Sequence, residues 1–395
     1  GRAQENELSH ASAKSVIMLW LAGGPSQLET FDPHPGTKIA AGTGAINTSV
    51  EGVQIAAGLQ RVAEVMDDLT IVRSMISEEG DHERASYNMK TGYRPVPALI
   101  HPSIGAVICH ELPEAGVDIP RHISILPGQW PARGGYLGAG FDAFKVYATR
   151  GRTGNMIAQV KPERQEKRLE ALKKVEDSFA RGRRANLDEK TTLHNITIQK
   201  ALQMMDSKRL DAFDVSKAPI KILREFGDSQ FGRGCLAAIQ LIKAGVRCVE
   251  VTLDGWDTHL NNHEGHAKLN AVLDPAFAAL IRELRARELL DQTVVICGGE
   301  FGRTPKVNSL GGRDHWPKGF SVALAGGGFK GGHVHGKTDP EGQSEEPKDP
   351  IKVSDIHSTV LHALGIKHDK EMMTQIGRPM EISKGKIIKT LLKDK

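Results

Sequence analysis

Short, unbroken apolar runs that end in glycine-rich or acidic turns constrain the fold of this chain most. The run SVIMLWL (15–21) ends at GGP, and TVVICGG (293–299) ends at a glutamate. A strand that is apolar on both faces is typical of a parallel sheet covered on both sides. Further runs of this kind are LTIVRSM (69–75), HISIL (122–126), VRCVEVTL (246–253) and FSVALAGGG (320–328). The sequence therefore predicts a large central sheet.

Helical patterns alternate with these runs. HERASYNMKTG (82–92) predicts a helix that stops at Gly92, and HPSIGAVICHEL (101–112) predicts a second one. Later helices are predicted at 234–245, 269–290 and 353–366. Strands that alternate with helices favour the α/β class, with a mostly parallel central sheet sandwiched between helices.

The chain is predicted to hold one domain, over residues 14–395. Residues 1–13 are polar and are expected to be a flexible N-terminal segment. Residues 161–212 are charged and poor in glycine, which favours a helical insertion with a solvated face. Residues 328–350 form a long polar stretch, which predicts a lid, a binding segment or a mobile loop.

Composition excludes several classes of protein. With 39% hydrophobic residues in 395, the chain can bury a large core. No basic block is interleaved with aromatic residues, so nucleic acid is not an expected partner. No apolar run reaches the length of a membrane span, and the four cysteines form no C-x-x-C pair. The chain starts without Met, which is compatible with a removed export signal.

The stretch LDGWDTH (253–259) follows a predicted strand and carries acidic residues and a histidine. Ligands bind at the carboxyl ends of parallel strands, so Asp254 at the strand end and His259 beyond the turn can meet there. Carboxylate and imidazole together suit zinc, manganese or a similar divalent ion. In this interpretation Asp257 shapes the turn. Alternatively, Asp254 caps the next helix and His259 is an exposed surface residue.

A second predicted strand ends at an acidic residue, Glu300. The stretch GGRDHWP contains a histidine, His315, about fifteen residues later. A glutamate that ends a buried strand is costly without a partner. A bound cation would neutralise Glu300. Alternatively, Glu300 forms an ordinary ion pair with Arg303, and His315 only packs on Trp316.

Four motifs occur in an order that resembles a known family: GGPSQLETFDP, VTLDGWDTH, GGEFGRTP and GGRDHW. Over roughly residues 14–380 the chain resembles the domain-of-unknown-function family fifteen-oh-one, a sulfatase-like family placed in the alkaline phosphatase superfamily. The resemblance implies an alkaline phosphatase-like fold and a metal site that hydrolyses or transfers phosphate or sulfate esters. It also implies that Asp254, His259 and His315 bind one metal. The family commonly carries a removable signal, so the resemblance implies a periplasmic or extracellular location, without excluding the cytoplasm.

The chain departs from the superfamily pattern at the second metal and at the nucleophile. Ala22 and Phe301 stand where the second metal's ligands are expected, so only Glu300 remains of that site. Gly80, Asp81 and His82 stand where a Ser, Thr or modified Cys nucleophile is expected. No C-x-P-S-R signature is present, which argues against formylglycine chemistry.

Several residues near these positions are candidates for catalysis. Asp81 or His82 is expected to act as a metal ligand, a general base or a nucleophile, and Arg84 to clamp an anionic ester. The alternative is that Asp81 caps the helix, with the other two on its surface. Ser26 is a weaker candidate nucleophile, with turn capping as its alternative.

These observations predict a metal-dependent hydrolase of phosphate or sulfate esters. It would bind one divalent ion, zinc or manganese first and calcium as a further possibility, and would use water as the nucleophile. Arg84 and Arg303 would hold the anionic group, and His82 would move the proton. The alternative is a non-catalytic sulfatase-like protein that binds an anionic glycan or another partner.

Overall fold

The computed structural model describes residues 13–112, 116–151, 160–181, 198, 201–205, 207–344 and 346–394. Except for its last residue, Ala13, the predicted N-terminal segment lies outside this range.

In the part of the chain that the structure describes, a nine-stranded sheet forms the centre, in the order β12-β4-β11-β8-β1-β7-β5-β6, with β13 paired to β4. The strands are β1 (Ser15–Ala22), β4 (Leu69–Ile76), β5 (His122–Ile125), β6 (Phe144–Val146), β7 (Cys248–Asp254), β8 (Thr293–Gly298), β11 (Phe320–Ala325), β12 (His333–His335) and β13 (Ile351–Lys352). Among the described residues, β11 alone runs antiparallel to its neighbours in this sheet, β4 and β8. The predicted mostly parallel sheet is therefore confirmed.

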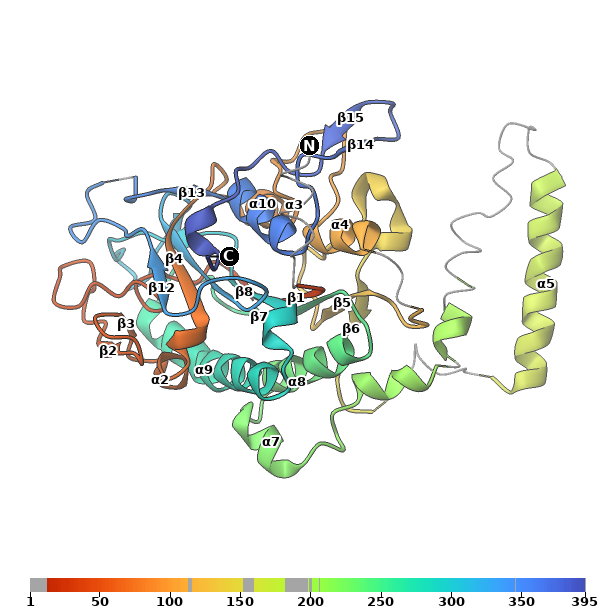
Figure 1. Cartoon of the computed structure of the whole chain (residues 1–395), viewed down its shortest axis with the longest axis horizontal. Helices are drawn as coiled ribbons and strands as arrows, with labels where there is room; N and C mark the ends of the chain where they lie inside the picture. The colour runs from red at the N-terminus through yellow and green to blue at the C-terminus, as the bar shows by residue number, and fades with distance from the viewer. Residues whose placement is uncertain are drawn as a thin grey trace.

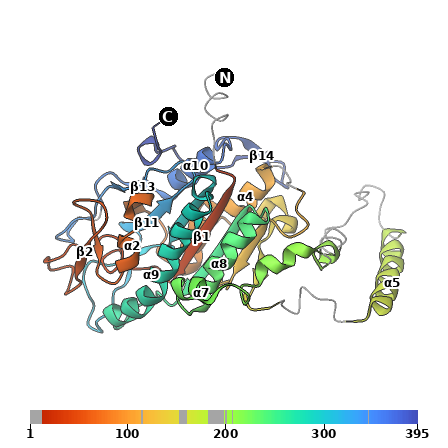
Figure 2. The same ribbon diagram turned by 60° about the horizontal axis from the view of Figure 1, so that its bottom comes forward.

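Helices cover both faces of the sheet (Figures 1 and 2). They are α2 (Gln60–Ala63), α3 (His82–Thr91), α4 (Ile104–Glu111), α5 (Pro162–Arg181), α7 (Ile220–Glu225), α8 (Gln230–Lys243), α9 (Asn262–Ala286) and α10 (Val353–Ala363). In both views α8 and α9 lie along one face and α4 and α10 along the other, while α5 stands to one side of the body.

The central strand β1 shows why its sequence is apolar throughout. Ile17, Leu19 and Leu21 belong to the core under α8 and α9, whereas Met18 and Trp20 belong to the core under α3, α4 and α10. Successive side chains of a strand point to opposite faces, so a strand between two helical layers has to be apolar at every position.

Helix α3 ends as its sequence predicts. Gly92 takes the left-handed conformation, with φ of 76°, and its amide donates to the carbonyl of Asn88. This is the ordinary C-terminal glycine cap of a helix. At the other end, the Asp81 side chain accepts a hydrogen bond from the amide of Arg84, so Asp81 caps the helix.

Two predictions about elements need correction. The stretch 328–350 is not a single loop, because His333–His335 forms β12, which pairs in parallel with β4. The long helix expected at 269–290 begins seven residues earlier and ends at Ala286, with Pro275 inside it. Of the predicted insertion at 161–212, the described part holds α5 and a 3-10 helix, Lys208–Phe213. The described residues also form three short two-stranded sheets: β2 (Ala45–Asn47) with β3 (Gln54–Ala56), β9 (Gly302–Arg303) with β10 (His315–Trp316), and β14 (Glu371–Met373) with β15 (Pro379–Glu381).

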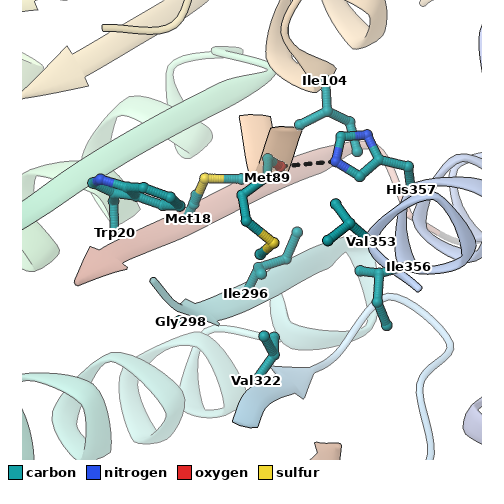
Figure 3. A pocket seen from close by; sticks show the side chains of 10 residues that line it. All are labelled: Met18, Trp20, Met89, Ile104, Ile296, Gly298, Val322, Val353, Ile356 and His357. Carbon is teal, nitrogen blue, oxygen red and sulfur yellow. Dashed lines mark hydrogen bonds between the residues drawn. The ribbon is translucent and has the colours of Figure 1, made fainter. Parts of the chain in front are cut away.

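A small apolar cavity of about 20 Å³ lies between the sheet and the layer formed by α3, α4 and α10. Figure 3 shows the residues that line it, among them Met18, Met89 and His357, whose Nε2 donates to the Met89 carbonyl at 2.8 Å. The cavity has the size of about one water molecule and few polar partners for it. It is a gap in packing and does not form a ligand site.

All four cysteines are buried and free. No helix in the described part of the chain is long and apolar enough to cross a membrane.

Candidate metal centre

The candidate site is built from segments that lie far apart in the sequence. His82 is the first residue of α3, and Asp257 and His259 lie in the turn after β7. His315 lies on β10, which pairs with β9 directly after β8 and Glu300. The parallel strands β1, β7 and β8 are neighbours, so the turns that follow them meet at one edge of the sheet.

Three imidazole nitrogens converge on one carboxylate. Asp257 Oδ1 lies 3.1 Å from His259 Nε2 and 3.4 Å from His315 Nε2. Asp257 Oδ2 lies 3.3 Å from His82 Nε2. The two Nε2 atoms of His259 and His315 are 3.0 Å apart. Every one of these distances is about that between neighbouring ligand atoms of a tetrahedral zinc site, whose bonds of about 2.0–2.1 Å give edges of about 3.3 Å.

The second nitrogen of each imidazole is held by an acceptor. His82 Nδ1 lies 2.7 Å from Glu300 Oε1, and His259 Nδ1 lies 2.9 Å from Asp314 Oδ1. His315 Nδ1 lies 2.7 Å from the carbonyl of Gly80, an atom that can only accept. These partners place the proton on Nδ1, so in the neutral rings the Nε2 lone pairs point toward the common centre.

Two lone pairs that face each other at 3.0 Å repel unless a proton or a cation lies between them. The same arrangement, with Nδ1 hydrogen-bonded to a carboxylate or carbonyl, is typical of histidines that bind a metal. The residues that the structure brings together therefore fit a divalent ion bound by nitrogen and oxygen ligands, with His82, Asp257 and His315 as its core.

The charges around the centre are balanced by buried partners. Burial by itself lowers the pKa of His82, but its hydrogen bond to Glu300 and the charges of Glu300 and Asp257 leave the pKa above the ordinary value. Burial raises the pKa of Asp257, but the hydrogen bond and charge of Arg303 outweigh that effect and lower it. The pKa of His315 is lowered, first by burial.

Arg303 links two of the turns at the site through hydrogen bonds. It is fully buried, and its Nη2 donates to Asp257 Oδ1 at 2.7 Å. Its Nε donates to the carbonyl of Gly24 at 2.8 Å, and its Nη2 also contacts the carbonyl of Gly23. These bonds join the turn after β1 to the turn after β7. Arg303 therefore positions Asp257, and its donors are directed at the protein rather than at a bound ester.

The structure distributes the predicted metal ligands unevenly. The Nε2 atoms of His259 and His315 lie next to each other. Glu300 contacts Nδ1 of His82, the ring nitrogen that does not face Asp257, and its Oε1 also accepts a hydrogen bond from the Gly23 amide at 2.9 Å. Glu300 is 1% exposed, and its Oε2 has no hydrogen-bond partner among the described residues. Asp254 is exposed, and its carboxylate accepts from the neighbouring amide of Gly255. No described contact brings Asp254 to the histidines.

The predicted catalytic residues also differ in their surroundings. Arg84 is 48% exposed on its side chain and binds the buried Glu79 through Nε and Nη2, at 2.7 and 3.0 Å. Among the described residues, its Nη1 has no hydrogen-bond partner and is free to bind an anion. Ser26 is completely buried, and it is its amide, not its hydroxyl, that donates to His266. A substrate cannot reach such a hydroxyl without rearrangement.

Sequence reasoning gave Asp257 only the role of shaping the turn, and it left the role of His82 open. The signal that pointed to both was their neighbourhood: an aspartate two residues before His259, and a histidine at the first position of a helix that follows a strand. What the sequence did not contain was the direction of each side chain.

The solved structures that are similar to this chain include three that are each 12% identical to it. PsFucS1, a sulfatase from Pseudoalteromonas sp., is 12% identical, with a TM-score of 0.43 over 93% of this chain and 72% of its own. The phosphonate monoester hydrolase of Silicibacter pomeroyi is 12% identical, with a TM-score of 0.40 over 96% and 76%. The alkaline phosphatase of the Antarctic bacterium TAB5 is 12% identical, with a TM-score of 0.38 over 89% and 98%.

None of the curated proteins matches the sequence. The sequence model of one family, described as a protein of unknown function (DUF1501), matches residues 13–392, which is nearly the whole chain. This is the family that the four motifs resemble. The chain belongs to the DUF1501 family.

Proposed function

We propose that this protein is a metal-dependent hydrolase of phosphate or sulfate esters that binds one divalent ion. The observation that supports the proposal is the convergence of three Nε2 atoms on Asp257, with each Nδ1 held by an acceptor. Zinc and manganese suit this mixture of imidazole and carboxylate best, and calcium suits it less because it prefers oxygen ligands.

The residues that would hold the ion are His82, Asp257, His259 and His315. A divalent ion bound there would supply Lewis acidity toward an oxygen of the phosphoryl or sulfuryl group. Glu300 and Asp314 orient the imidazoles, and Arg303 holds the carboxylate of Asp257 in place. Asp254 has no part in this proposed ligand set.

The remaining chemistry would come from water and from Arg84. Positions 80–82, at the start of α3 and just before it, hold no serine, threonine or cysteine, and Ser26 is buried, so water is the proposed nucleophile. Arg84, oriented by Glu79, would bind an anionic oxygen of the ester through the free side of its guanidinium. The substrate would be an anionic small molecule or glycan ester, and we propose an extracytoplasmic location as the sequence resemblance implies.

Metal content and turnover together test the proposal. Purified protein is analysed by elemental mass spectrometry and assayed with phosphate and sulfate mono- and diesters in the presence of zinc, manganese or calcium. We expect about one ion per chain and turnover of at least one ester class. Absence of a bound ion after incubation with all three metals would refute the metal centre.

The variant His82→Gln separates two roles for this residue. If His82 is a ligand, the variant loses metal affinity and turnover together. If His82 only moves a proton, the variant keeps the ion at full stoichiometry and loses turnover, with a changed pH profile.

A non-catalytic function is supported by one observation. Phe301, fully buried and stacked on His315 at 4.4 Å between ring centroids, stands where the resemblance implies a second metal ligand. Saturable binding of a sulfated glycan without product, by protein that holds its ion, would favour this alternative.

A further inference from the structure

Trp130 lies beside the candidate metal centre and has no role in the function proposed above. It follows β5 in a loop at the same edge of the sheet, and its side chain is partly exposed. Its indole ring lies 6.1 Å from the imidazole of His82 between centroids, and the two planes are only 10° apart. A large aromatic side chain is thus presented next to the histidine at the centre of the site.

A buried network fixes the backbone of Trp130. Its carbonyl accepts a hydrogen bond from Lys90 Nζ at 2.9 Å. Lys90 is 5% exposed and lies 2.9 Å from Glu250 Oε2, and Glu250 Oε1 accepts from Ser124 Oγ at 3.0 Å. The Lys90 ammonium also lies 4.7 Å from the ring centroid of Trp20. A lysine in this position is costly unless it is paired and fully hydrogen-bonded, and here its bonds determine where the Trp130 loop sits.

The same helix carries the histidine and the lysine. His82 begins α3, and Lys90 lies two turns later on it. Any shift of α3 therefore moves the imidazole and the anchor of the Trp130 loop together. This coupling keeps the distance and the angle between the indole and the imidazole constant. A surface aromatic residue without a function would not need such an arrangement.

We infer that Trp130 is the platform on which a ring in the alcohol part of the ester stacks. The inference rests on the proposed function, since it assigns the rest of the substrate once the anionic group lies at the metal centre. The indole offers a wide apolar face, and flat rings stack on such faces. The substrate class is then an ester whose alcohol part has a flat apolar ring face, either an aromatic ring or a pyranose.

Binding of non-hydrolysable phosphonates tests the inference without requiring turnover. Zinc-loaded protein is titrated by calorimetry with methylphosphonate, with phenylphosphonate and with the phosphonate analogue of glucose 1-phosphate. We expect at least one ring-bearing phosphonate to bind about tenfold more tightly than methylphosphonate, as expected for one good stacking contact. The phosphonate that binds more tightly identifies the ring in the alcohol part of the substrate as aromatic or as a sugar.

Three variants complete the test. Trp130→Ala is expected to remove the preference for rings while it keeps the affinity for methylphosphonate and the zinc stoichiometry. Trp130→Phe is expected to restore most of the preference. Tyr147→Ala, which removes an exposed aromatic ring just after the outermost strand β6, serves as the control and should keep the preference unchanged.

The positioning role of Lys90 is tested with the double variant Lys90→Met/Glu250→Gln, because removing the lysine alone leaves a buried charge unpaired. We expect this variant to bind methylphosphonate normally and to lose part of the ring preference.

The outcomes separate this inference from the function on which it rests. If the wild type binds no phosphonate at all, both the anion site and the platform are refuted. If it binds methylphosphonate and the ring-bearing phosphonates equally, only the platform is refuted. A ring preference that survives in Trp130→Ala also refutes the platform and leaves the proposed hydrolase intact.

Discussion

At the scale of single residues, the turn after β7 determines which aspartate reaches the histidines. Gly255 has φ of 105°, a conformation that favours glycine, and the turn that it permits directs Asp254 to its own neighbour's amide. Asp257, three residues on, is the one that meets the imidazoles. A sequence shows two aspartates near a histidine, but the choice between them depends on a backbone angle that the sequence alone does not fix.

The pair Asp257→Asn and Asp254→Asn tests this choice. Asp257→Asn removes the charge that three Nε2 atoms and Arg303 share, so we expect metal affinity to fall by about 100-fold or more. Asp254→Asn, its matched control, should leave metal affinity within about twofold of the wild type. Competition with a chromophoric chelator measures both. Equal losses in the two variants, or a loss only in Asp254→Asn, would return Asp254 to the ligand set.

Gly23 offers a second test at this scale. It has φ of 110°, and a Cβ there would lie 2.5 Å from the amide nitrogen of Asp257, while its own amide donates to Glu300. Gly36 also has a positive φ, of 78°, but a Cβ there would meet nothing within 4 Å. Both Gly→Ala variants therefore strain the backbone, and only one presses on the site.

We expect Gly23→Ala to lower the free energy of unfolding by about 2 kcal/mol more than Gly36→Ala and to weaken metal binding as well. Urea denaturation and the chelator assay measure these effects. If the two variants lose equal stability and both keep the wild-type metal affinity, the close approach between the turns after β1 and β7 is not important for the site.

At the scale of elements, the apolar runs identified the strands well, because burial on both faces leaves a pattern in the sequence itself. β1, β4, β7 and β8 begin or end within two residues of their predicted bounds. The direction of β11 was not predictable in this way. Its run FSVALA is as apolar as the others, but it lies antiparallel to β4 and β8, which is a matter of pairing and not of composition.

Helix α10 contains a buried histidine that makes stability depend on pH. Burial lowers the pKa of His357 to about 4, while Nε2 donates to the Met89 carbonyl. Above an ordinary pKa of about 6.5 the histidine is neutral in both the folded and the unfolded state. As the pH falls from about 6.5 to 4, the unfolded state binds a proton that the folded state does not, so stability is lost in this window.

We expect His357→Gln, which keeps a donor for the Met89 carbonyl, to reduce this loss by on the order of 3 kcal/mol between pH 6.5 and 4. Urea denaturation at intervals of half a pH unit measures it. His110→Gln, on the exposed side of α4, is the control. An unchanged pH dependence in His357→Gln would show that His357 binds its proton equally in both states.

At the scale of the whole molecule, the candidate centre joins parts of the chain that lie far apart in the sequence. Its residues come from the start of α3, the turn after β7 and strand β10, so positions 82, 257 and 315 meet in one place. A site of this kind does not exist in the unfolded chain, and an ion that binds it therefore stabilises the fold as a whole. Sequence spacing could suggest Asp254 and His259 as a local pair, but the contribution of α3 depends on how the layers pack.

Thermal unfolding with and without zinc tests this coupling. With free zinc at about 100 times its Kd, binding adds about 2.7 kcal/mol to the free energy of unfolding. For a chain of this size that corresponds to a rise in Tm of about 3 °C.

EDTA should reverse the rise, and Asp257→Asn should show neither effect, whereas Asp254→Asn should respond like the wild type. The variant distinguishes binding at the candidate centre from zinc bound elsewhere on the surface, because zinc held by exposed histidines would raise the Tm of both variants alike. An equal rise in both would mean that the stabilising ion lies outside the cluster around Asp257.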